Sequence, residues 1–205
     1  MPYDEKRPVI RFDELPVQLL SEVYEPLPMK SGKPARYDYE YEREGTACLL
    51  VAFEPLTGRR LVETSRRRTQ ADYCRFQQRV AEAWPEADKI VLVQDNLNTY
   101  NSSSFYEHLP PAYAFILAQK FEFRYTPKKG SWLNIAELEL PALSRICLRR
   151  RISSIEELDC EVQAVVKERN ELQIRVKWQL SISQAREKLN RHYEKVKSKS
   201  SITEH

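Results

Sequence analysis

The sequence predicts an α/β protein built on one mixed sheet, with an antiparallel meander at one side and parallel strands at the other. Two observations predict this class. Three strand-like segments follow one another between residues 9 and 64, with no helical pattern between them. From residue 69 onwards, segments with helical spacing alternate with short apolar runs, as they do where helices connect parallel strands.

The first three predicted strands make up the meander. Residues 9–14 form a short apolar strand, which residues 17–20 can continue beyond Pro16. Residues 46–53, TACLLVAF, are nearly all apolar, as expected of a central strand that is covered on both faces. A proline and a glycine then predict a turn into a partner strand at 60–64.

The segment between the first two strands has a different composition. Residues 24–45, YEPLPMKSGKPARYDYEYEREG, are rich in proline, tyrosine and charge, and they keep no sustained period. Because proline and glycine favour turns over regular elements, we expect a surface excursion such as a long hairpin.

Helices and strands alternate over the rest of the chain. Thr69 is the predicted N-cap of a helix that ends near Ala83, with Tyr73, Phe76 and Val80 on one face. Further elements are expected in this order: a strand at 89–94, a helical stretch at 103–120 interrupted near two prolines, a strand at 121–125, and helices at 134–148, 154–170 and 184–199.

Length and composition exclude several classes of protein. With 205 residues, the chain is one large domain or one domain with an appendage. Only 4 glycines occur, and neither GxGxxG nor GxxxxGK[ST] is present, which argues against dinucleotide-binding and P-loop enzymes. The net charge of +3 permits a polyanionic partner without requiring one. No apolar run approaches the ~18 residues of a membrane span, so we expect no membrane partner.

The four cysteines predict the redox compartment. They are far apart and include no CxxC pair, which argues against both a disulfide framework and a zinc site. We expect all four to be buried thiols in a reducing cytoplasm.

Three acids stand where α/β proteins place functional groups. Asp95 follows the apolar run in VLVQDNLNTY, and the carboxyl end of a buried strand commonly holds a ligand or a metal. Asp13 lies inside the first strand, where a carboxylate is costly unless it is paired or bound to a metal. Glu137 falls in the first turn of the helix predicted after the last strand. If the first and fourth strands are neighbours, Asp13 and Asp95 converge, and that helix can bring Glu137 to them.

Carboxylates without histidine or cysteine suit Mg²⁺ or Mn²⁺ better than zinc. Two such ions about 3.5–4 Å apart can activate an attacking oxygen and stabilise a leaving one in phosphodiester chemistry. Each acid also has a structural explanation. Asp95 can turn the chain and cap the next helix, Asp13 can pair with Arg11 or Lys6, and Glu137 can face solvent.

Five stretches of the chain carry a resemblance to a known family. They lie between residues 7 and 193 and read RPVIRFDELPVQLL, KPARYDYEYEREGTACLLVAFEPLTG, DKIVLVQDNLNTY, YTPKKGSWLNIAELELPALSR and KWQLSISQAREKLNRHY. The chain resembles the bacterial insertion-sequence transposases of the DDE superfamily, specifically the insertion sequence six-thirty family, which is related to the mariner elements.

The resemblance implies an RNase H-like catalytic core at residues 1–150, with a mixed five-stranded sheet flanked by helices, and a helical C-terminal extension with a basic tail at 151–205. The catalytic triad of the family maps onto Asp13, Asp95 and Glu137, which would bind two Mg²⁺ or Mn²⁺ ions. The family cuts DNA at the element ends by hydrolysis and then uses the freed 3′ hydroxyl to attack target DNA. The implied setting is a homodimer on DNA in the bacterial cytoplasm, at the nucleoid.

The sequence departs from the family pattern in places. Tyr100 stands where the family often has histidine after DNLNT, and Lys129 stands where PKHGSW is usual. The family also carries helix-turn-helix domains before the first catalytic strand, whereas this chain begins shortly before Asp13. We expect that N-terminal DNA-binding half to be encoded separately, or the chain to be a truncated copy. The alternatives to an active transposase are a catalytically idle remnant that binds DNA or partner chains, and an RNase H-like nuclease with a host function.

Basic clusters are candidates for contacts with the DNA backbone. Two of them flank the helix of Glu137, where a phosphate would pass: Lys128 and Lys129 before it, and Arg149, Arg150 and Arg151 after it. A solvated charge run is the default explanation for the three arginines, as it is for RRR at 66–68. The resemblance favours phosphate contacts for at least one of these two runs.

Overall fold

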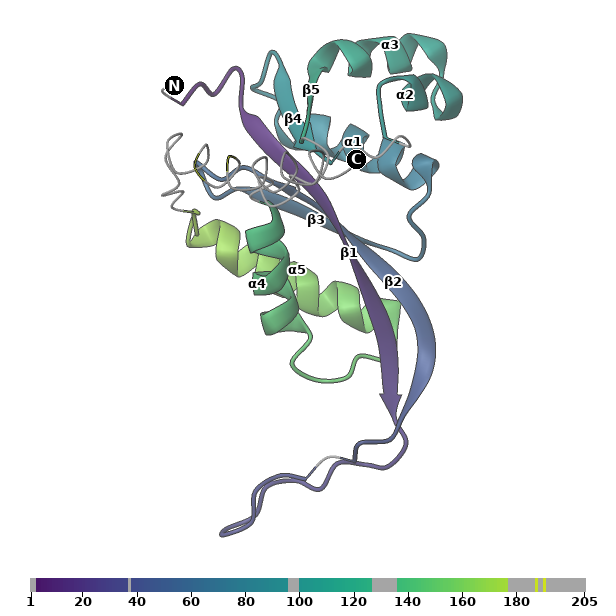
Figure 1. Ribbon diagram of the computed structural model, residues 1–205, viewed down its shortest axis with the longest axis vertical. Helices are drawn as coiled ribbons and strands as arrows, with labels where there is room; N and C mark the ends of the chain where they lie inside the picture. Colours follow the sequence, from purple (N-terminus) through teal and green to yellow (C-terminus); the bar gives the residue numbers. More distant parts are fainter. Residues whose placement is uncertain are drawn as a thin grey trace, which may run out of the picture.

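The fold is organised around one five-stranded sheet, and the computed structural model describes residues 3–36, 38–95, 100–126, 136–176, 187 and 190, without the side chains of Glu137 and Leu138. The strand order is β3-β2-β1-β4-β5 (Figure 1). The strands are β1 (Val9–Glu22), β2 (Tyr41–Phe53), β3 (Arg60–Ser65), β4 (Ile90–Gln94) and β5 (Phe121–Tyr125).

β1 is the central strand, and it joins the two halves of the sheet. It pairs with β2 in the antiparallel direction and with β4 in the parallel direction. The predicted meander and the predicted neighbourhood of the first and fourth strands are both confirmed. β1 also continues through Pro16 as one strand, because β4 pairs with it only as far as Arg11 and leaves Pro16 with a single neighbouring strand.

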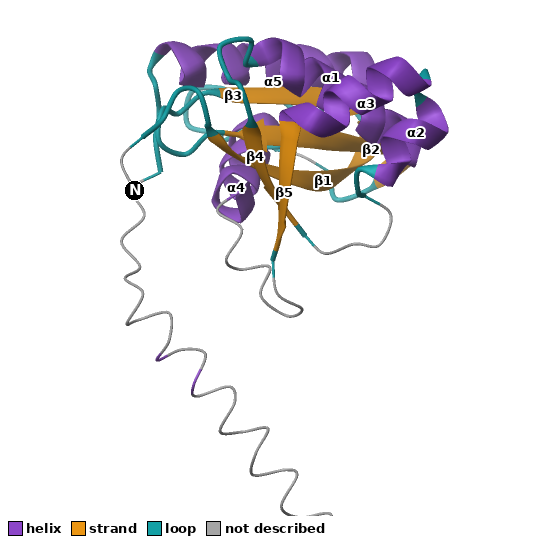
Figure 2. Ribbon diagram, turned by 90° about the horizontal axis from the view of Figure 1, so that it is seen from above, coloured by secondary structure: helices purple, strands orange, loops and turns teal. Residues whose placement is uncertain are grey.

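Helices cover both faces of the sheet (Figure 2). One face packs against α1 (Gln70–Ala83), α2 (Ser103–His108) and α3 (Pro111–Lys120), through a core cluster that includes Ile10, Phe12, Phe76, Leu92 and Phe105. The other face packs against α4 (Ala136–Cys147) and α5 (Ile155–Glu171), through a second cluster that includes Val17, Val51, Leu143, Leu158 and Val162. No helix in the described part of the chain is long and apolar enough to cross a membrane.

The predicted helices are confirmed where the structure describes them. Thr69 caps α1 in a capping box with Asp72, and the stretch at 103–120 divides into α2 and α3 near its two prolines. The helix expected at 184–199 lies outside the described residues, apart from single positions. The domain boundary expected at residue 150 falls between α4 and α5, and both of these helices contribute to the same core cluster.

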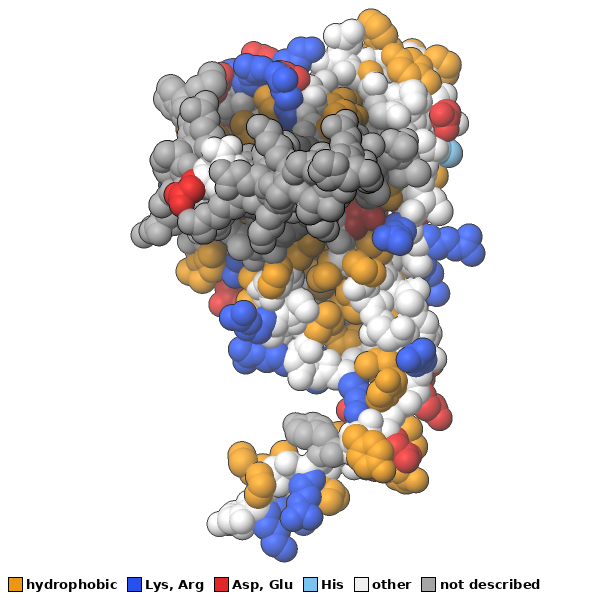
Figure 3. Space-filling model, in the orientation of Figure 1, with side chains coloured by type: hydrophobic (Ala, Val, Ile, Leu, Met, Phe, Trp, Pro, Cys, Tyr) orange, Lys and Arg blue, Asp and Glu red, His pale blue; other side chains and the backbone are white. Residues whose placement is uncertain are grey.

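A long β-hairpin, here called the arm and comprising residues 23–40, connects β1 to β2 and projects away from the body of the molecule (Figure 1). Bridges between Leu27 and Arg36 and between Lys30 and Lys33 pair its two sides. Basic side chains gather toward its end (Figure 3). The excursion expected between the first two strands is therefore a hairpin.

A buried ion cluster fixes α4 against the sheet and α5. The carboxylate of Glu139 lies 2.9 Å from Nε of Arg60 and accepts hydrogen bonds from Arg169 Nε and Nη2 at 3.0 and 2.9 Å. The side chains of Arg60 and Glu139 are 0% and 1% exposed. Because burial favours the uncharged form, it lowers the pKa of Arg60, and the neighbouring Glu139 charge offsets part of this effect.

Candidate active site

The sheet register brings two of the three predicted acids together. Arg11 pairs with Val93, so Asp13 and Asp95 lie two residues beyond the same register pair on neighbouring parallel strands. Alternation along β1 puts Asp13 on the face that carries Val17, and therefore on the face that α4 covers. Asp95 comes two residues after Val93, as Asp13 comes two residues after Arg11, so it continues the same face of the sheet. The two carboxylates thus share one edge and one face of the sheet.

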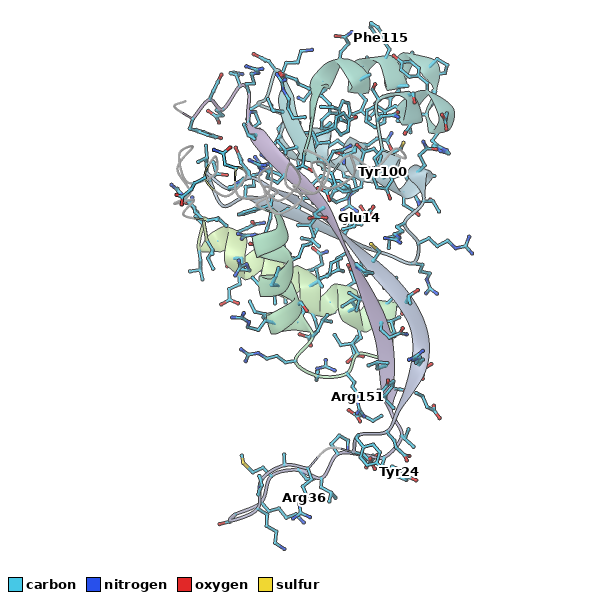
Figure 4. The ribbon with its side chains drawn as sticks, viewed as in Figure 1. Glu14, Tyr24, Arg36, Tyr100, Phe115 and Arg151 are labelled. Atoms are coloured by element: carbon cyan, nitrogen blue, oxygen red, sulfur yellow. The ribbon has the colours of Figure 1, made fainter. Side chains whose placement is uncertain are left out.

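Both aspartates line one small pocket of about 140 Å³. Its other lining residues come from β1, the turn before α1, the end of β4 and the segment before α2: Phe12, Glu14, Arg68, Gln94 and Tyr100. Figure 4 places Glu14 and Tyr100 close together at the centre of the molecule, where β1 passes the start of the helical layer. The pocket therefore lies where the carboxyl end of β4 meets the middle of β1, close to the position where open α/β sheets bind ligands.

Hydrogen bonds from neighbouring residues orient the two aspartates. The hydroxyl of Thr126 donates to Oδ1 of Asp95 at 2.9 Å, and the backbone N–H of Thr126 donates to the carbonyl of Gln94 at 3.0 Å. Oδ1 of Asp13 accepts the backbone N–H of Glu14 at 2.8 Å. Each carboxylate thus has one oxygen held by a neighbouring donor, which restricts its rotation.

Glu137 belongs to the first turn of α4, as predicted, and its side chain lies outside the described atoms. α4 begins at Ala136 on the face of the sheet that carries Asp13. The ion cluster around Glu139, two residues further on, fixes this end of the helix to β3 and α5. The backbone of Glu137 is therefore placed by a buried contact that lies close to it in sequence.

A buried amide holds the chain after β4. Gln94 is 1% exposed; its Oε1 accepts the hydroxyl of Tyr73 at 2.8 Å, and its Nε2 donates to the carbonyl of Tyr100 at 2.7 Å. The ring of Tyr100 stacks on that of Tyr73 with centroids 4.4 Å apart. Since the side-chain oxygen and nitrogen of Gln94 both have partners, this network fixes Tyr100 relative to the strand that delivers Asp95.

Tyr100 stands where the family that the sequence resembles often has histidine. It interacts with a fourth acidic residue at the pocket, Glu14. Its hydroxyl donates to the carboxylate of Glu14. Burial raises the pKa of Glu14, and the hydrogen bond and the nearby Arg68 oppose that shift. Burial and the same carboxylate raise the pKa of Tyr100 well above its ordinary value, so its hydroxyl stays protonated and acts as a donor.

The residues at the pocket fit a hard divalent cation. The carboxylates of Asp13 and Asp95 supply oxygen ligands, and a volume of about 140 Å³ holds an ion with some of its waters. Among the side chains that the structure describes, no group of three or more His, Cys, Asp or Glu converges as a metal site. Of the predicted triad, Asp13 and Asp95 belong to these described side chains and Glu137 does not.

The structure gives different surroundings to the basic residues that were predicted to contact DNA. Lys128 and Lys129 lie outside the described residues. The three arginines after α4 line a groove of about 570 Å³ beside the second half of β1. Their contacts differ: Arg149 Nε donates to a backbone carbonyl of α4, Arg150 pairs with two glutamates of α5, and Arg151 binds Glu22 and the carbonyls of Asp38 and Glu40 at the root of the arm.

Sequence reasoning overlooked Thr126, Gln94 and Glu14. Thr126 follows β5 just as Asp95 follows β4, and the pairing of Gln94 with Tyr125 makes the two residues neighbours. A polar residue directly after each of two neighbouring parallel strands was therefore a signal that could have predicted a contact between Thr126 and Asp95. No sequence signal distinguished Glu14 from an exposed strand residue, because its burial depends on Tyr100 and Arg68, which are distant in the sequence.

A mixed five-stranded sheet of this order, flanked by helices, with one aspartate inside β1 and another directly after the neighbouring β4, defines an RNase H-like fold of the DDE type. A family model described as DDE superfamily endonuclease matches residues 8–159. The chain belongs to this family. No curated protein matches the chain.

Proposed function

We propose that this chain is the catalytic domain of a transposase of the insertion sequence six-thirty family, which cleaves DNA at element ends and joins the freed 3′ hydroxyl to target DNA. Membership of the DDE superfamily endonucleases supports a DNA substrate. The observation that carries the proposal is the pair Asp13 and Asp95, which face one pocket from neighbouring parallel strands.

In this proposal Asp13, Asp95 and Glu137 hold two Mg²⁺ or Mn²⁺ ions, which supply activation of an attacking oxygen and stabilisation of a leaving one. The chain's own residues prepare the site. Thr126 orients Asp95, and the buried contacts of Glu139 hold the helix of Glu137. A homodimer on DNA and a separately encoded DNA-binding half would complete the assembly.

Cleavage assays on a labelled element end test this proposal. In Mg²⁺, Asp13→Asn, Asp95→Asn and Glu137→Gln should each abolish cutting, because each removes a charge from the site and keeps the side-chain volume. Asp159→Asn is the matched control, since Asp159 is an exposed aspartate on α5. If the three triad variants cut as well as the parent, the assignment is wrong. If the parent binds DNA and never cuts it, even with the N-terminal half supplied, the chain is an idle remnant.

A further inference from the structure

The pocket lined by Asp13, Glu14 and Asp95 is here called the acid pocket. Among the described residues that line it, Arg68 is the one basic side chain. It lies between β3 and α1, directly before the N-cap Thr69, so the capping box with Asp72 fixes the backbone next to it. Its side chain is 66% exposed, so most of the guanidinium faces solvent at the rim of the pocket. The nearest carboxylate oxygen, Oε2 of Glu14, is 4.0 Å from Nη1, which is too far for a hydrogen bond.

Neighbouring arginines do not share this position. Arg66 is also exposed, but its Nη2 donates to Glu156 of α5 at 2.9 Å, away from the pocket. Arg68 therefore combines proximity to Asp13 and Asp95 with guanidinium donors that the described residues leave unused. A guanidinium in such a place can bind a phosphate through two parallel hydrogen bonds.

Glu14 is built into the pocket wall behind Arg68. Its side chain is 10% exposed, and its Oε1 is buried with no hydrogen-bond partner among the described residues. The same carboxylate interacts with the hydroxyl of Tyr100, whose ring is stacked on Tyr73. A buried carboxylate that is fixed in this way attracts the guanidinium at 4.0 Å without consuming its donors.

The charges of the pocket show what Arg68 can contribute. Asp13, Glu14 and Asp95 place three acids around one cavity, and these acids repel a DNA phosphate unless cations are present. Metal ions would neutralise Asp13 and Asp95. A phosphate next to the reacting one would still need a cation supplied by the protein, and Arg68 lies at the rim where such a phosphate would pass.

We propose that Arg68 binds a DNA backbone phosphate beside the acid pocket, and that Glu14, itself held by Tyr100, is the positioning residue that keeps the Arg68 guanidinium there. The inference rests on the proposed function, because it names a further contact with the same DNA substrate. It predicts a loss of DNA affinity that does not depend on the triad or on cleavage.

The test is a titration of labelled duplex DNA, followed by fluorescence anisotropy at several salt concentrations with Ca²⁺ as the metal probe. Arg68→Ala should weaken binding on the order of 5- to 10-fold at low salt and reduce the salt slope by about 0.9, as expected for one lost phosphate contact. Arg68→Lys should keep the salt slope of the parent, because it retains the positive charge. Its affinity should lie between those of Arg68→Ala and the parent, because lysine cannot make the bidentate hydrogen bonds of arginine. Arg66→Ala is the matched control and should leave both quantities near those of the parent.

A double-mutant cycle tests the role of Glu14. Glu14→Gln should weaken DNA binding in the parent and have no effect in the Arg68→Ala background, because it acts only through Arg68. Equal losses in both backgrounds, or tighter binding by Glu14→Gln alone, would show that Glu14 does not position Arg68. Thermal melting of each variant identifies any loss that comes from unfolding.

The two proposals fail in different ways. If Arg68→Ala binds DNA like Arg66→Ala while the triad variants lose cleavage, the phosphate contact is wrong and the transposase assignment stands. If the triad variants still cut DNA, the proposed function is wrong, whatever Arg68 does.

Discussion

Asp13 and Asp95 place like charges at one edge of the sheet, and the folded chain gains from any cation that binds between them. We expect Mn²⁺ at about 100 times its Kd to stabilise the parent by about 2.7 kcal/mol, and the melting temperature to rise by several degrees. Asp13→Asn should lose most of this rise, because the change replaces one carboxylate oxygen with an NH₂ group and removes the negative charge. Differential scanning calorimetry with and without Mn²⁺ measures the effect.

Asp159→Asn serves as the control for this measurement too. A rise in melting temperature that persists undiminished in Asp13→Asn would mean that Mn²⁺ binds elsewhere on the chain.

The cysteines differ in reactivity because they differ in burial. Burial raises the pKa of Cys48 to about 12 and those of Cys74 and Cys147 to about 11, whereas Cys160 is exposed on the outer side of α5. The expectation that all four thiols are buried is therefore wrong for Cys160, because the buried residues of α5 are Leu158, Val162, Val165 and Val166.

We predict that iodoacetamide at pH 8 labels Cys160 in the folded protein and leaves the other three thiols intact. Thiolate is the reactive form, and a pKa of about 11 leaves roughly one thiolate in a thousand at that pH. Raising the pH toward 11 increases that fraction, and unfolding in urea exposes all four thiols. Mass spectrometry of the digested protein reads out the labelled positions. Rapid labelling of Cys74 in folded protein would contradict the packing of α1.

At the scale of elements, α4 depends on a buried charge cluster. Glu139→Gln removes the carboxylate that faces both Arg60 and Arg169 and leaves two guanidinium groups without their common partner. We expect a loss of about 3–5 kcal/mol in the free energy of unfolding, which is typical of a broken buried ion pair. Cleavage should fall further than DNA binding, because the same helix carries Glu137. Urea unfolding and the cleavage assay measure the two effects.

Glu168→Gln is the control for this change, since Glu168 is an exposed acid on α5. If the two variants are equally stable, the ion cluster does not hold α4 in place.

Gly58 marks a close approach between the β2–β3 turn and the chain after α5. Its φ is +83°, and a Cβ at this position would lie 2.8 Å from the backbone carbon of Gln173 and 2.8 Å from the carbonyl oxygen of Ile174. Gly58→Ala should therefore cost more than the roughly 1–2 kcal/mol of left-handed strain alone, because backbone atoms must also move. Gly32→Ala supplies the comparison, since Gly32 has a φ of +75° and open space around it.

Equal changes in the free energy of unfolding for these two variants, measured in urea, would show that the contact at Gly58 is not restrictive.

The elements differ in how far the sequence predicts them. The apolar run of β4 and the capped helix α1 follow from local patterns, so their positions were correct. The convergence of Asp13 and Asp95 required the assumption that the first and fourth strands are neighbours, which the alternation of elements favoured. The ion cluster and the Gln94 network join residues that are far apart in the sequence, and no local pattern contains that information.

At the scale of the whole molecule, the groove beside β1 determines where weak DNA binding should occur. Arg149 has no carboxylate partner among the described residues, whereas Arg150 is paired with Glu157 and Glu161.

We predict that the chain binds duplex DNA with little sequence preference and a steep salt dependence, because phosphate contacts carry no sequence information. Arg149→Ala should lower affinity alike for an element end and for scrambled DNA, and Arg150→Ala should lower it less. Titrations at several salt concentrations compare them, and tight, salt-insensitive selection of the element end would contradict this expectation.

The central place of β1 also determines the order in which the pocket can assemble during synthesis. β1, the arm, β2 and β3 are contiguous in the chain, so the antiparallel half of the sheet needs only local loop closure. The parallel partner of Val9 is Val91, which leaves the ribosome much later. Until then, one edge of β1 near Asp13 has no strand beside it and is open to pairing with other chains. A nascent chain that stops before β4 therefore lacks Asp95, so the two-aspartate pocket, and with it the proposed metal site, forms only after β4 has been made.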